Sequence, residues 1–256
     1  MEHAKNRLPR GRPFEDSIEL AAAGVKRRLL EIYEALYAHF GPQHWWPADG
    51  SFEVIVGAIL TQNTSWRNVE KAIANLKGAE ALSPEKMAAL SPKELAVLIR
   101  PSGYYRRKAE RLLHFLSYFK DQYAFDLQTM LRQPMAKIRT ELLRVKGIGP
   151  ETADSILLYA GGYPIFVVDT YTKRIFSRHG LAREGCNYGE LQDLFMKALP
   201  RDVRLFNEYH ALLVRLGKSR CLGIPRCHGC VLEPMLDQMP DSLGGSSDGA
   251  IFLGRG

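Results

Sequence analysis

Residues 138–178 read IRTELLRVKGIGPETADSILLYAGGYPIFVVDTYTKRIFSR, and this stretch decides the fold of the chain. An apolar helical pattern leads into VKGIG, and Pro150 begins a second helix after it. Gly147 and Gly149 permit a tight hairpin and a close approach to the backbone. The first turn of the second helix has unpaired N–H groups and a positive dipole end, which suit a phosphate. The stretch therefore predicts two helices and a hairpin that either connects them only or also binds an anion.

Apolar residues at helical spacing continue on both sides of this hairpin. Ser83 and Ser91 each precede a proline, which is typical of a helix N-terminus. No stretch alternates convincingly between polar and apolar residues, and strand candidates such as 165–168 are short. We therefore predict an all-α fold with helices over 25–40, 52–60, 66–76, 108–119, 138–145, 150–159, 169–178, 188–199 and 203–216.

Composition and charge narrow the class of protein. With 256 residues, 46% of them hydrophobic, the chain can bury one sizeable core or two modest ones, and it is not disordered by composition. No apolar run reaches the roughly 18 residues of a membrane helix, and no apolar segment follows the basic N-terminus as in a secretory signal. We therefore expect a soluble, intracellular protein. Its net charge of +7 favours a polyanion such as nucleic acid, although many basic proteins bind none.

Three of the four cysteines lie close together near the end of the chain. Cys221, Cys227 and Cys230 have the spacing C-x5-C-x2-C, whereas Cys186 stands alone. In an intracellular protein, such a cluster indicates metal binding before a disulfide.

Several separated motifs together resemble the endonuclease III superfamily of base-excision DNA glycosylases. VKGIG, GGYP and VVDTYTKRIF have the family's order and spacing, with Val145 in place of a leucine. The resemblance extends to ILTQNT at 59–64, to RPSGYYRRKAERL at 100–112 and to the cysteine cluster, so it covers residues 25–236. It implies an enzyme whose partner is double-stranded DNA containing a damaged base. We expect a monomer located in the cytoplasm, associated with the nucleoid if the protein is bacterial.

The resemblance also implies two helical lobes with a DNA cleft between them. A six-helix barrel over 43–163 would contain the hairpin at 138–160, and the other lobe would combine 15–42 with 164–236. Residues 1–14 are basic and contain Pro and Gly, and the end of the chain is rich in Gly and Ser. We expect mobile tails over 1–14 and 237–256.

Two carboxylates are the catalytic candidates. The family implies that Asp169 stabilises positive charge on the sugar and orients water, although an Asp before Thr170 can also simply cap a helix. Glu151 stands where bifunctional members have a nucleophilic lysine, and a carboxylate cannot form their imine. Glu151 either positions water or the base, or is an acidic residue favoured in a first helical turn. The resemblance therefore implies a monofunctional glycosylase with little or no AP-lyase activity.

An aromatic pocket is expected for the flipped base. Trp45, Trp46 and Phe52, together with ILTQNT and RPSGYY, resemble the branch that removes 3-methyladenine. An N3-methylated purine is cationic, so it stacks well on an electron-rich ring and leaves readily. The alternative is that Trp45 and Trp46 merely pack a helix junction.

The remaining DNA contacts follow from the same resemblance. Gly147, Ile148, Gly149 and Thr152 of the hairpin would bind the backbone of DNA. Gln62 and Asn63 stand where the family has a polar wedge that fills the space left by the flipped base, and Asn63 aligns best with that wedge. Surface polarity is the alternative for both. A basic run is either a solvated face or a set of phosphate contacts: Arg106, Arg107, Lys108 and Arg111.

The cysteine cluster departs from the family pattern C-x6-C-x2-C-x5-C. The first gap is one residue shorter, and Leu236 stands where the fourth cysteine belongs. We favour a structural 4Fe–4S cluster held by Cys221, Cys227 and Cys230 with an unknown fourth ligand, Asp237 or His228 being nearest in sequence. A three-iron cluster, a zinc site using His228, and no metal are the alternatives. Arg220 and Arg226 would then contact phosphates near this loop.

The sequence thus predicts a base-excision-repair DNA N-glycosylase that favours alkylated purines. One alternative is a bifunctional glycosylase and AP lyase that acts on oxidised pyrimidines through another amine. A second is a DNA-binding module that has lost its chemistry, and the presence of Asp169 argues against it.

Overall fold

The computed structural model describes residues 13–236, with side chains from residue 23 onward. Every regular element in this range is a helix, which confirms the predicted all-α class. The mobile tails expected at the two ends lie outside the described residues, except that Pro13 and Phe14 begin the first helix. Within the described range, no helix is long and apolar enough to cross a membrane.

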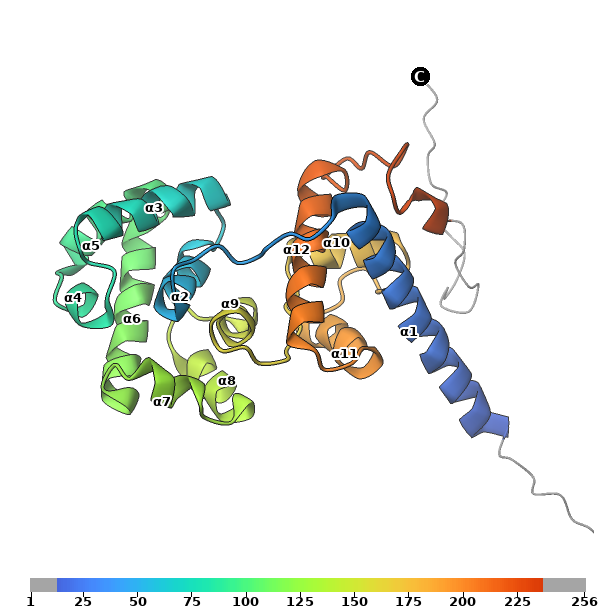
Figure 1. Ribbon diagram of the computed structural model, residues 1–256, viewed down its shortest axis with the longest axis horizontal. Coiled ribbons are helices and arrows are strands. Elements are labelled where there is room, and N and C mark those ends of the chain that lie inside the picture. Colours follow the sequence, from blue (N-terminus) through green and yellow to red (C-terminus); the bar gives the residue numbers. More distant parts are fainter. Residues whose placement is uncertain (1–12, 237–256) are drawn as a thin grey trace, which may run out of the picture.

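The helices form two lobes, joined by two extended segments of chain around residues 41–50 and 161–169 (Figure 1). The first lobe contains α2 (Ser51–Leu60), α3 (Trp66–Gly78), α4 (Pro84–Ala88), α5 (Pro92–Leu98), the 3-10 turn η1 (Arg100–Ser102), α6 (Tyr105–Tyr123), α7 (Leu127–Leu131), α8 (Met135–Arg144), α9 (Pro150–Ser155) and the π-helical turn η2 (Ile156–Ala160). The second contains α1 (Pro13–Phe40), α10 (Thr170–Arg178), α11 (Tyr188–Ala198), α12 (Val203–Ser219) and η3 (Glu233–Met235).

Local capping explains why short helices form where the Ser-Pro pairs stand. The Ser83 side chain accepts a hydrogen bond from the Lys86 amide at the start of α4. Ser91 forms a capping box with Glu94 at the start of α5. Each cap satisfies N–H groups that have no partner inside the helix. Both predicted helix starts are confirmed.

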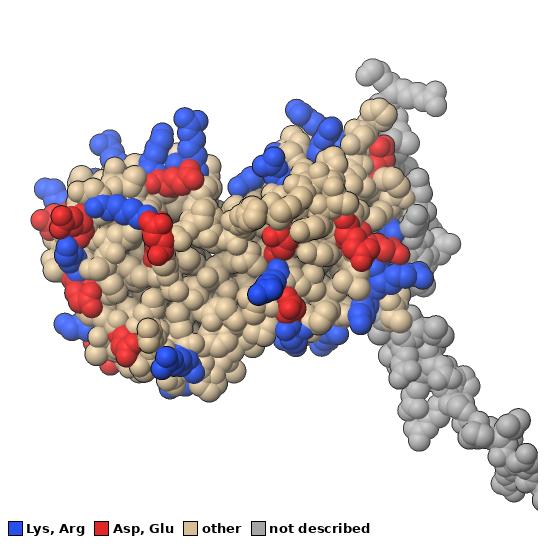
Figure 2. Space-filling view, in the orientation of Figure 1, with Lys and Arg blue, Asp and Glu red and all other residues tan. Residues whose placement is uncertain are grey.

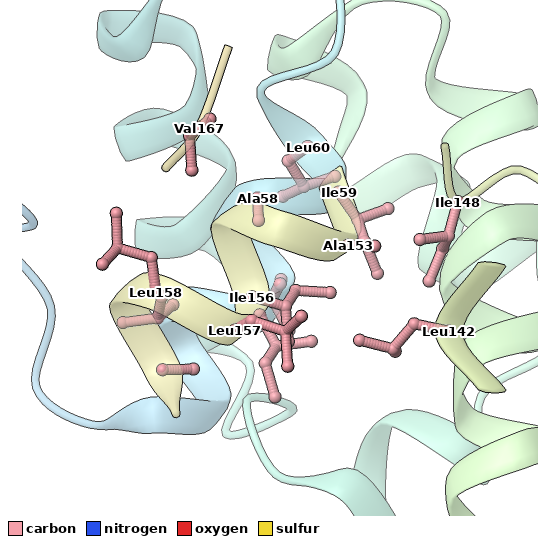
Figure 3. Close-up of a cluster of buried hydrophobic side chains, with 14 of the residues drawn as sticks. Ala58, Ile59, Leu60, Leu142, Ile148, Ala153, Ile156, Leu157, Leu158 and Val167 are labelled. Atoms are coloured by element: carbon pink, nitrogen blue, oxygen red, sulfur yellow. The ribbon is translucent and has the colours of Figure 1, made fainter. Parts of the chain in front are cut away.

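The core of the first lobe surrounds α2. All its residues from Val54 to Leu60 are buried, as expected for a helix that is apolar on every side. Figure 3 shows Ala58, Ile59 and Leu60 packed beside the apolar side chains of α9 and η2. The hairpin therefore rests directly on the central helix of the lobe, which holds its two glycines at a defined place.

The single helix predicted over 150–159 changes type after Ser155. The Gly161 amide donates to the Ile156 carbonyl, five residues back, which is the hydrogen bond of a π-helical turn. Only glycine fits at position 161, because a Cβ there would lie 2.6 Å from the Tyr163 ring. This extra residue per turn sets the position of Tyr159, whose ring lies beside α12.

A buried polar network joins the hairpin to the second lobe. Asp154 of α9 accepts two hydrogen bonds from Arg139 of α8, at 2.7 and 3.0 Å. The same carboxylate accepts from Tyr188 at 2.8 Å and from Gln192 at 2.7 Å, both on α11. Gln192 also donates to the Phe166 carbonyl. The carboxylate is therefore fully paired, as a buried charge must be.

Candidate active site

Asp169 is the N-cap of α10 and lies at the junction of the two lobes. Its Oδ1 accepts from the backbone N–H of Thr172 at 2.7 Å and from the Thr172 hydroxyl at 2.8 Å. Its Oδ2 lies 3.7 Å from Nε2 of His210 on α12. Burial alone would raise the pKa of Asp169, but His210 and the Thr172 donors outweigh it and hold the pKa below its usual value. The capping interpretation is confirmed, and one oxygen remains directed away from the cap.

Tyr159 and His210 form the support behind this carboxylate. The Tyr159 hydroxyl hydrogen-bonds to Nδ1 of His210. Burial and the charge of Asp169 raise the pKa of Tyr159 well above its usual value, so the phenol keeps its proton and donates it to Nδ1. Nε2 of the same ring faces Asp169 and is buried without a hydrogen-bond partner. Neither residue could be singled out from the sequence, because neither belongs to a local motif.

All three tryptophans of the chain meet in one cluster beside Tyr159. The ring centroids of Trp46 and Trp66 are 4.9 Å apart, and those of Trp46 and Tyr159 are 5.1 Å apart. Trp45 lies 5.6 Å from Trp46, and the indole nitrogens of both are buried without a partner. Trp66 was not among the predicted site residues, although it lies only two residues after the ILTQNT motif and could have been included for that reason.

Phe52 lies apart from this cluster. It lines a separate hollow together with Asp49, Lys77 and Glu80. Among the described residues, no ring contact joins Phe52 to Trp45 or Trp46. The structure therefore separates Phe52 from the two tryptophans with which it was expected to form one pocket.

Glu151 faces the same junction from the first turn of α9. Burial and the negative charge of Asp169 raise the pKa of Glu151, and His210 and Lys173 act in the opposite direction. The carboxyl group nevertheless keeps contact with solvent. Two neighbouring carboxyl groups thus have pKa values displaced in opposite directions, an arrangement that suits separate roles in proton transfer and charge stabilisation.

Lys218, near the end of α12, is a cation on the rim of this site. Its Nζ lies 6.0 Å from the Trp45 ring centroid. Burial lowers the pKa of Lys218, and the charge of Asp169 opposes that shift. The amine therefore lies within electrostatic reach of the catalytic candidate.

The hairpin is tied to the loop that follows α2. Gln62 donates to the Gly147 carbonyl at 3.1 Å and to the Thr152 hydroxyl at 2.9 Å, and it accepts from Arg111. Asn63 is exposed and has a φ of 53°. Of the two wedge candidates, Gln62 is thus engaged within the protein, and the Asn63 side chain projects outward.

The hairpin itself has the geometry that its glycines predicted. Gly147 has a φ of 93°, and a Cβ there would overlap the Arg111 side chain. Ile148 is buried and anchors the turn. Gly149 caps α9, and no atom lies within 4 Å of the place a Cβ would take. The backbone at Gly149 is therefore open to an approaching ligand.

Lys108 does not belong to a phosphate-binding run. It is only 1% exposed, and its Nζ donates to the Leu60 carbonyl at 2.8 Å and the Ser102 carbonyl at 2.6 Å. It therefore satisfies the C-terminus of α2. Arg106 and Arg107 are exposed and Arg111 is partly exposed, so these three residues remain the candidates for phosphate contacts.

The three clustered cysteines line one small cavity of about 30 Å³. Arg178 donates to the Cys221 sulfur at 3.3 Å, and burial raises the pKa of the Cys230 thiol. His228 is fully exposed, whereas Cys186 lies in a different hollow beside α11. Within residues 13–236, no group of three His, Cys, Asp or Glu side chains is already arranged to hold an ion. Asp237 lies outside the described residues.

Positive side chains follow one edge of the molecule. Figure 2 shows Lys and Arg along the upper border of both lobes, on either side of a notch between them. Cations on both sides of a cleft suit a polyanion that lies across it.

Comparisons with known proteins agree with this geometry. Residues 56–201 match the family model described as HhH-GPD superfamily base excision DNA repair protein. The chain is 44% identical over 207 residues to MJ1434 of Methanocaldococcus jannaschii, provisionally named a DNA repair glycosylase, covering 80% of this chain and 94% of the relative. It is 30% identical over 183 residues to endonuclease III of Thermotoga maritima, covering 71% and 80%.

Two solved structures share the fold. The 3-methyladenine DNA glycosylase of H. pylori, bound to 1,N6-ethenoadenine, superimposes with a TM-score of 0.64 at 30% identity, covering 77% of this chain and 97% of that one. A non-covalent endonuclease III–DNA complex superimposes with a TM-score of 0.70 at 24% identity, covering 82% and 93%.

Proposed function

This chain belongs to the HhH-GPD superfamily of base excision DNA repair proteins, and from that premise we propose that it is a monofunctional glycosylase for alkylated purines such as 3-methyladenine. It is a DNA repair glycosylase at the level of its family. The finer proposal concerns the lesion and the nucleophile. It rests chiefly on one observation, which is that Glu151 and Asp169 face the same junction and no lysine stands at the position of Glu151.

Water is the proposed nucleophile. Cleavage of the N-glycosidic bond leaves positive charge on the sugar, and the ionised Asp169 stabilises that charge. His210 and Thr172 keep Asp169 ionised by lowering its pKa. Glu151 accepts a proton from the attacking water, for which its raised pKa is suited. The departing base carries the bonding electrons, which a cationic alkylated purine accepts readily.

The tryptophan cluster is the proposed binding place for the flipped base. Trp46 and Trp66 supply electron-rich rings, against which a cationic purine gains cation–π attraction. The Trp45 ring lies beside that of Trp46, with 5.6 Å between their centroids. The likeness to the H. pylori 3-methyladenine glycosylase supports this choice of lesion.

The hairpin and the loop after α2 are the proposed contacts to double-stranded DNA. The open backbone of Gly149 and the N-terminus of α9 suit a phosphate. Asn63 is the proposed wedge, because Gln62 is engaged with Gly147 and Thr152. Flipping costs a few kcal/mol, and a polar group that pairs with the orphaned base offsets part of it.

A bifunctional enzyme is the second candidate, and Lys218 is the observation that favours it. Burial lowers the pKa of this amine, which raises the fraction of neutral nucleophile. In this alternative, the Lys218 amine attacks C1′, the base leaves, and the resulting imine is trapped by borohydride. A trapped adduct that disappears in Lys218→Met would replace the water mechanism.

A single-turnover assay tests the proposal on duplexes that each contain one lesion: 3-methyladenine, an oxidised pyrimidine, uracil opposite guanine, or an abasic site. We expect strand breakage of the 3-methyladenine duplex only after alkali. Nicking of the abasic or oxidised-pyrimidine duplex without alkali would contradict a monofunctional enzyme.

The matched variants separate catalysis from capping. Asp169→Asn should lower the single-turnover rate by about 100-fold or more while DNA affinity is retained, because the charge facing the sugar is lost. Asp126 caps α7 in the same way, through the backbone and hydroxyl of Thr129. Asp126→Asn should excise at the parental rate. Equal rates for both variants would remove Asp169 from the mechanism.

A further inference from the structure

His179 is a buried histidine with one unpaired ring nitrogen. It follows α10 as the C-cap residue and is 7% exposed. Its Nδ1 is buried without a hydrogen-bond partner. A buried ring nitrogen without a hydrogen-bond partner costs free energy of folding. Such an atom in a native protein therefore calls for a partner of another kind, such as a bound water or ion.

The ring stands at the cavity of the cysteine cluster. Cys221, Cys227, Cys230 and His179 all line this one cavity, and Leu236, at the position of the family's fourth cysteine, closes it. Three cysteines and the histidine therefore border the same small space, and so does Glu233, whose carboxylate already accepts from the Gly229 amide. This donor set fits a four-ligand metal centre, which the three cysteines alone do not.

α10 fastens His179 to the cysteine loop. Arg174 donates to the Cys221 carbonyl at 2.7 Å. Arg178, the residue before His179, donates to the carbonyls of Leu222 and Gly223, both at 2.6 Å. These hydrogen bonds hold the end of α10, which carries the imidazole, against the loop that carries the three thiols. All four candidate ligands therefore lie on two segments that are joined to each other.

We propose that His179 is the fourth protein ligand of a metal centre formed with Cys221, Cys227 and Cys230. Each thiol releases its proton on ligation, and the imidazole contributes a lone pair. A Cys3His set holds zinc, and histidine also replaces cysteine at some iron–sulfur centres. The donors must move together on binding, because within the described residues they are not yet arranged around an ion. The exposed His228 remains outside the centre.

The proposal concerns the cysteine loop and is independent of the glycosylase mechanism, so excision can persist while this inference fails. Its test is the metal content of the full chain, purified without oxygen, as iron, sulfide and zinc per chain together with the visible absorption spectrum. Iron with sulfide indicates a cluster, and zinc without visible absorption indicates a single ion. A parental protein that retains neither overturns the proposal.

Three variants assign the ligand. His179→Ala should lower metal affinity at least about tenfold, since even the removal of outer-shell partners has effects of that size. His179→Cys should restore binding with an altered spectrum. His228→Ala is the matched control and should keep the parental content. Parental metal content and spectrum in His179→Ala, or loss in His228→Ala, would overturn the assignment.

A spectroscopic readout decides the matter if His179→Ala does not fold. In an iron-loaded protein containing 15N-labelled histidine, the reduced centre should show nitrogen hyperfine coupling that is absent from His179→Cys. In a zinc protein, cobalt substitution should give a spectrum of three sulfurs and one nitrogen, which becomes that of four sulfurs in His179→Cys. Identical spectra from parent and His179→Cys would exclude His179 as a ligand.

Discussion

Asp169 and Glu151 are neighbouring carboxylic acids whose surroundings displace their pKa values in opposite directions. His210 and Thr172 lower the pKa of Asp169 despite its burial, whereas burial and Asp169 itself raise the pKa of Glu151. Asp169 therefore keeps its charge to a lower pH than an ordinary aspartate, whereas Glu151 gains its proton at a higher pH than an ordinary glutamate. Two carboxylic acids of similar intrinsic acidity therefore differ in protonation because their surroundings differ.

Glu151→Gln should show this in two measurements. The parental excision rate should fall as the pH decreases through the raised pKa of Glu151, and the variant should lack that limb and react about 100-fold more slowly near neutrality. Because the pKa of Glu151 in the folded state lies above the 4.5 usual for a glutamate, its ionised form destabilises the folded state at neutral pH. The variant should therefore have the higher Tm at pH 7, and this advantage should vanish below about pH 4.5.

Glu85 provides the control, because it follows Pro84 in the first turn of α4 as Glu151 follows Pro150 in α9. Glu85→Gln should keep the parental pH–rate profile. If Glu151→Gln retains the acidic limb, another group accepts the proton.

At the scale of single elements, the two glycines of the hairpin have different roles: Gly147 is required by the fold, whereas Gly149 leaves the backbone open to a ligand. Gly147→Ala places a Cβ at positive φ and against Arg111, so it should destabilise the fold by about 1–3 kcal/mol. Gly149→Ala meets no atom and has an ordinary φ of −96°, so stability should be unchanged. If a DNA phosphate approaches this backbone, the Gly149→Ala variant should nevertheless bind DNA about tenfold more weakly, a loss of roughly 1.4 kcal/mol.

Urea denaturation and binding of an abasic-site duplex measure the two effects separately. Parental affinity in a stably folded Gly149→Ala would mean that the hairpin connects two helices without binding the DNA backbone.

The end of α2 depends on one buried amine. Lys108→Met leaves the carbonyls of Leu60 and Ser102 without their donor, so the free energy of unfolding should fall by about 1–3 kcal/mol. Burial, with a smaller effect of Arg111, lowers the pKa of Lys108 from 10.5 to about 8. The charged form therefore costs stability below pH 8, and this cost disappears as the pH rises through 10.5.

The stability gap between parent and Lys108→Met should accordingly widen between pH 8 and 10, as followed by urea denaturation. Arg107→Met, which changes an exposed neighbour, should show no such widening. A gap that stays constant with pH would mean that the amine does not titrate in this window.

At the scale of the whole molecule, Asp154 connects the hairpin to the second lobe. Asp154→Ala removes the acceptor shared by Arg139, Tyr188 and Gln192, so unfolding should become easier by about 3 kcal/mol. Excision should slow as well, because Glu151 and Asp169 approach each other from opposite lobes. Urea denaturation and the single-turnover rate measure the two consequences.

The control is an exposed ion pair on α11. Lys197 contacts Asp193 at 2.6 Å on the surface, and Lys197→Ala should change stability by less than about 1 kcal/mol. Equal losses from both variants would show that the buried network does not join the lobes.

Local chemistry is why much of this protein was predictable from its sequence. Helical periodicity, the Ser-Pro caps and the hairpin glycines depend on neighbours within about four residues, so the all-α class and most helix positions follow from reading along the chain. The motifs around Asp169 identified the family for the same reason. The split of the helix before Tyr159 was missed, because a π-helical turn depends on how its ring packs against α12.

The contacts between distant residues were decided only by the tertiary structure. Nothing local brings Trp66 to Trp46, His210 to Asp169, or His179 to the cysteines, and nothing local announces that Lys108 is buried while Arg106 and Arg107 are exposed. Periodicity identifies which face of a helix is apolar, but the partner of that face is chosen by the packing of the whole chain. The sequence alone therefore determined most of the helices, the hairpin and the family, whereas the fold determined which side chains share a site and how their pKa values move.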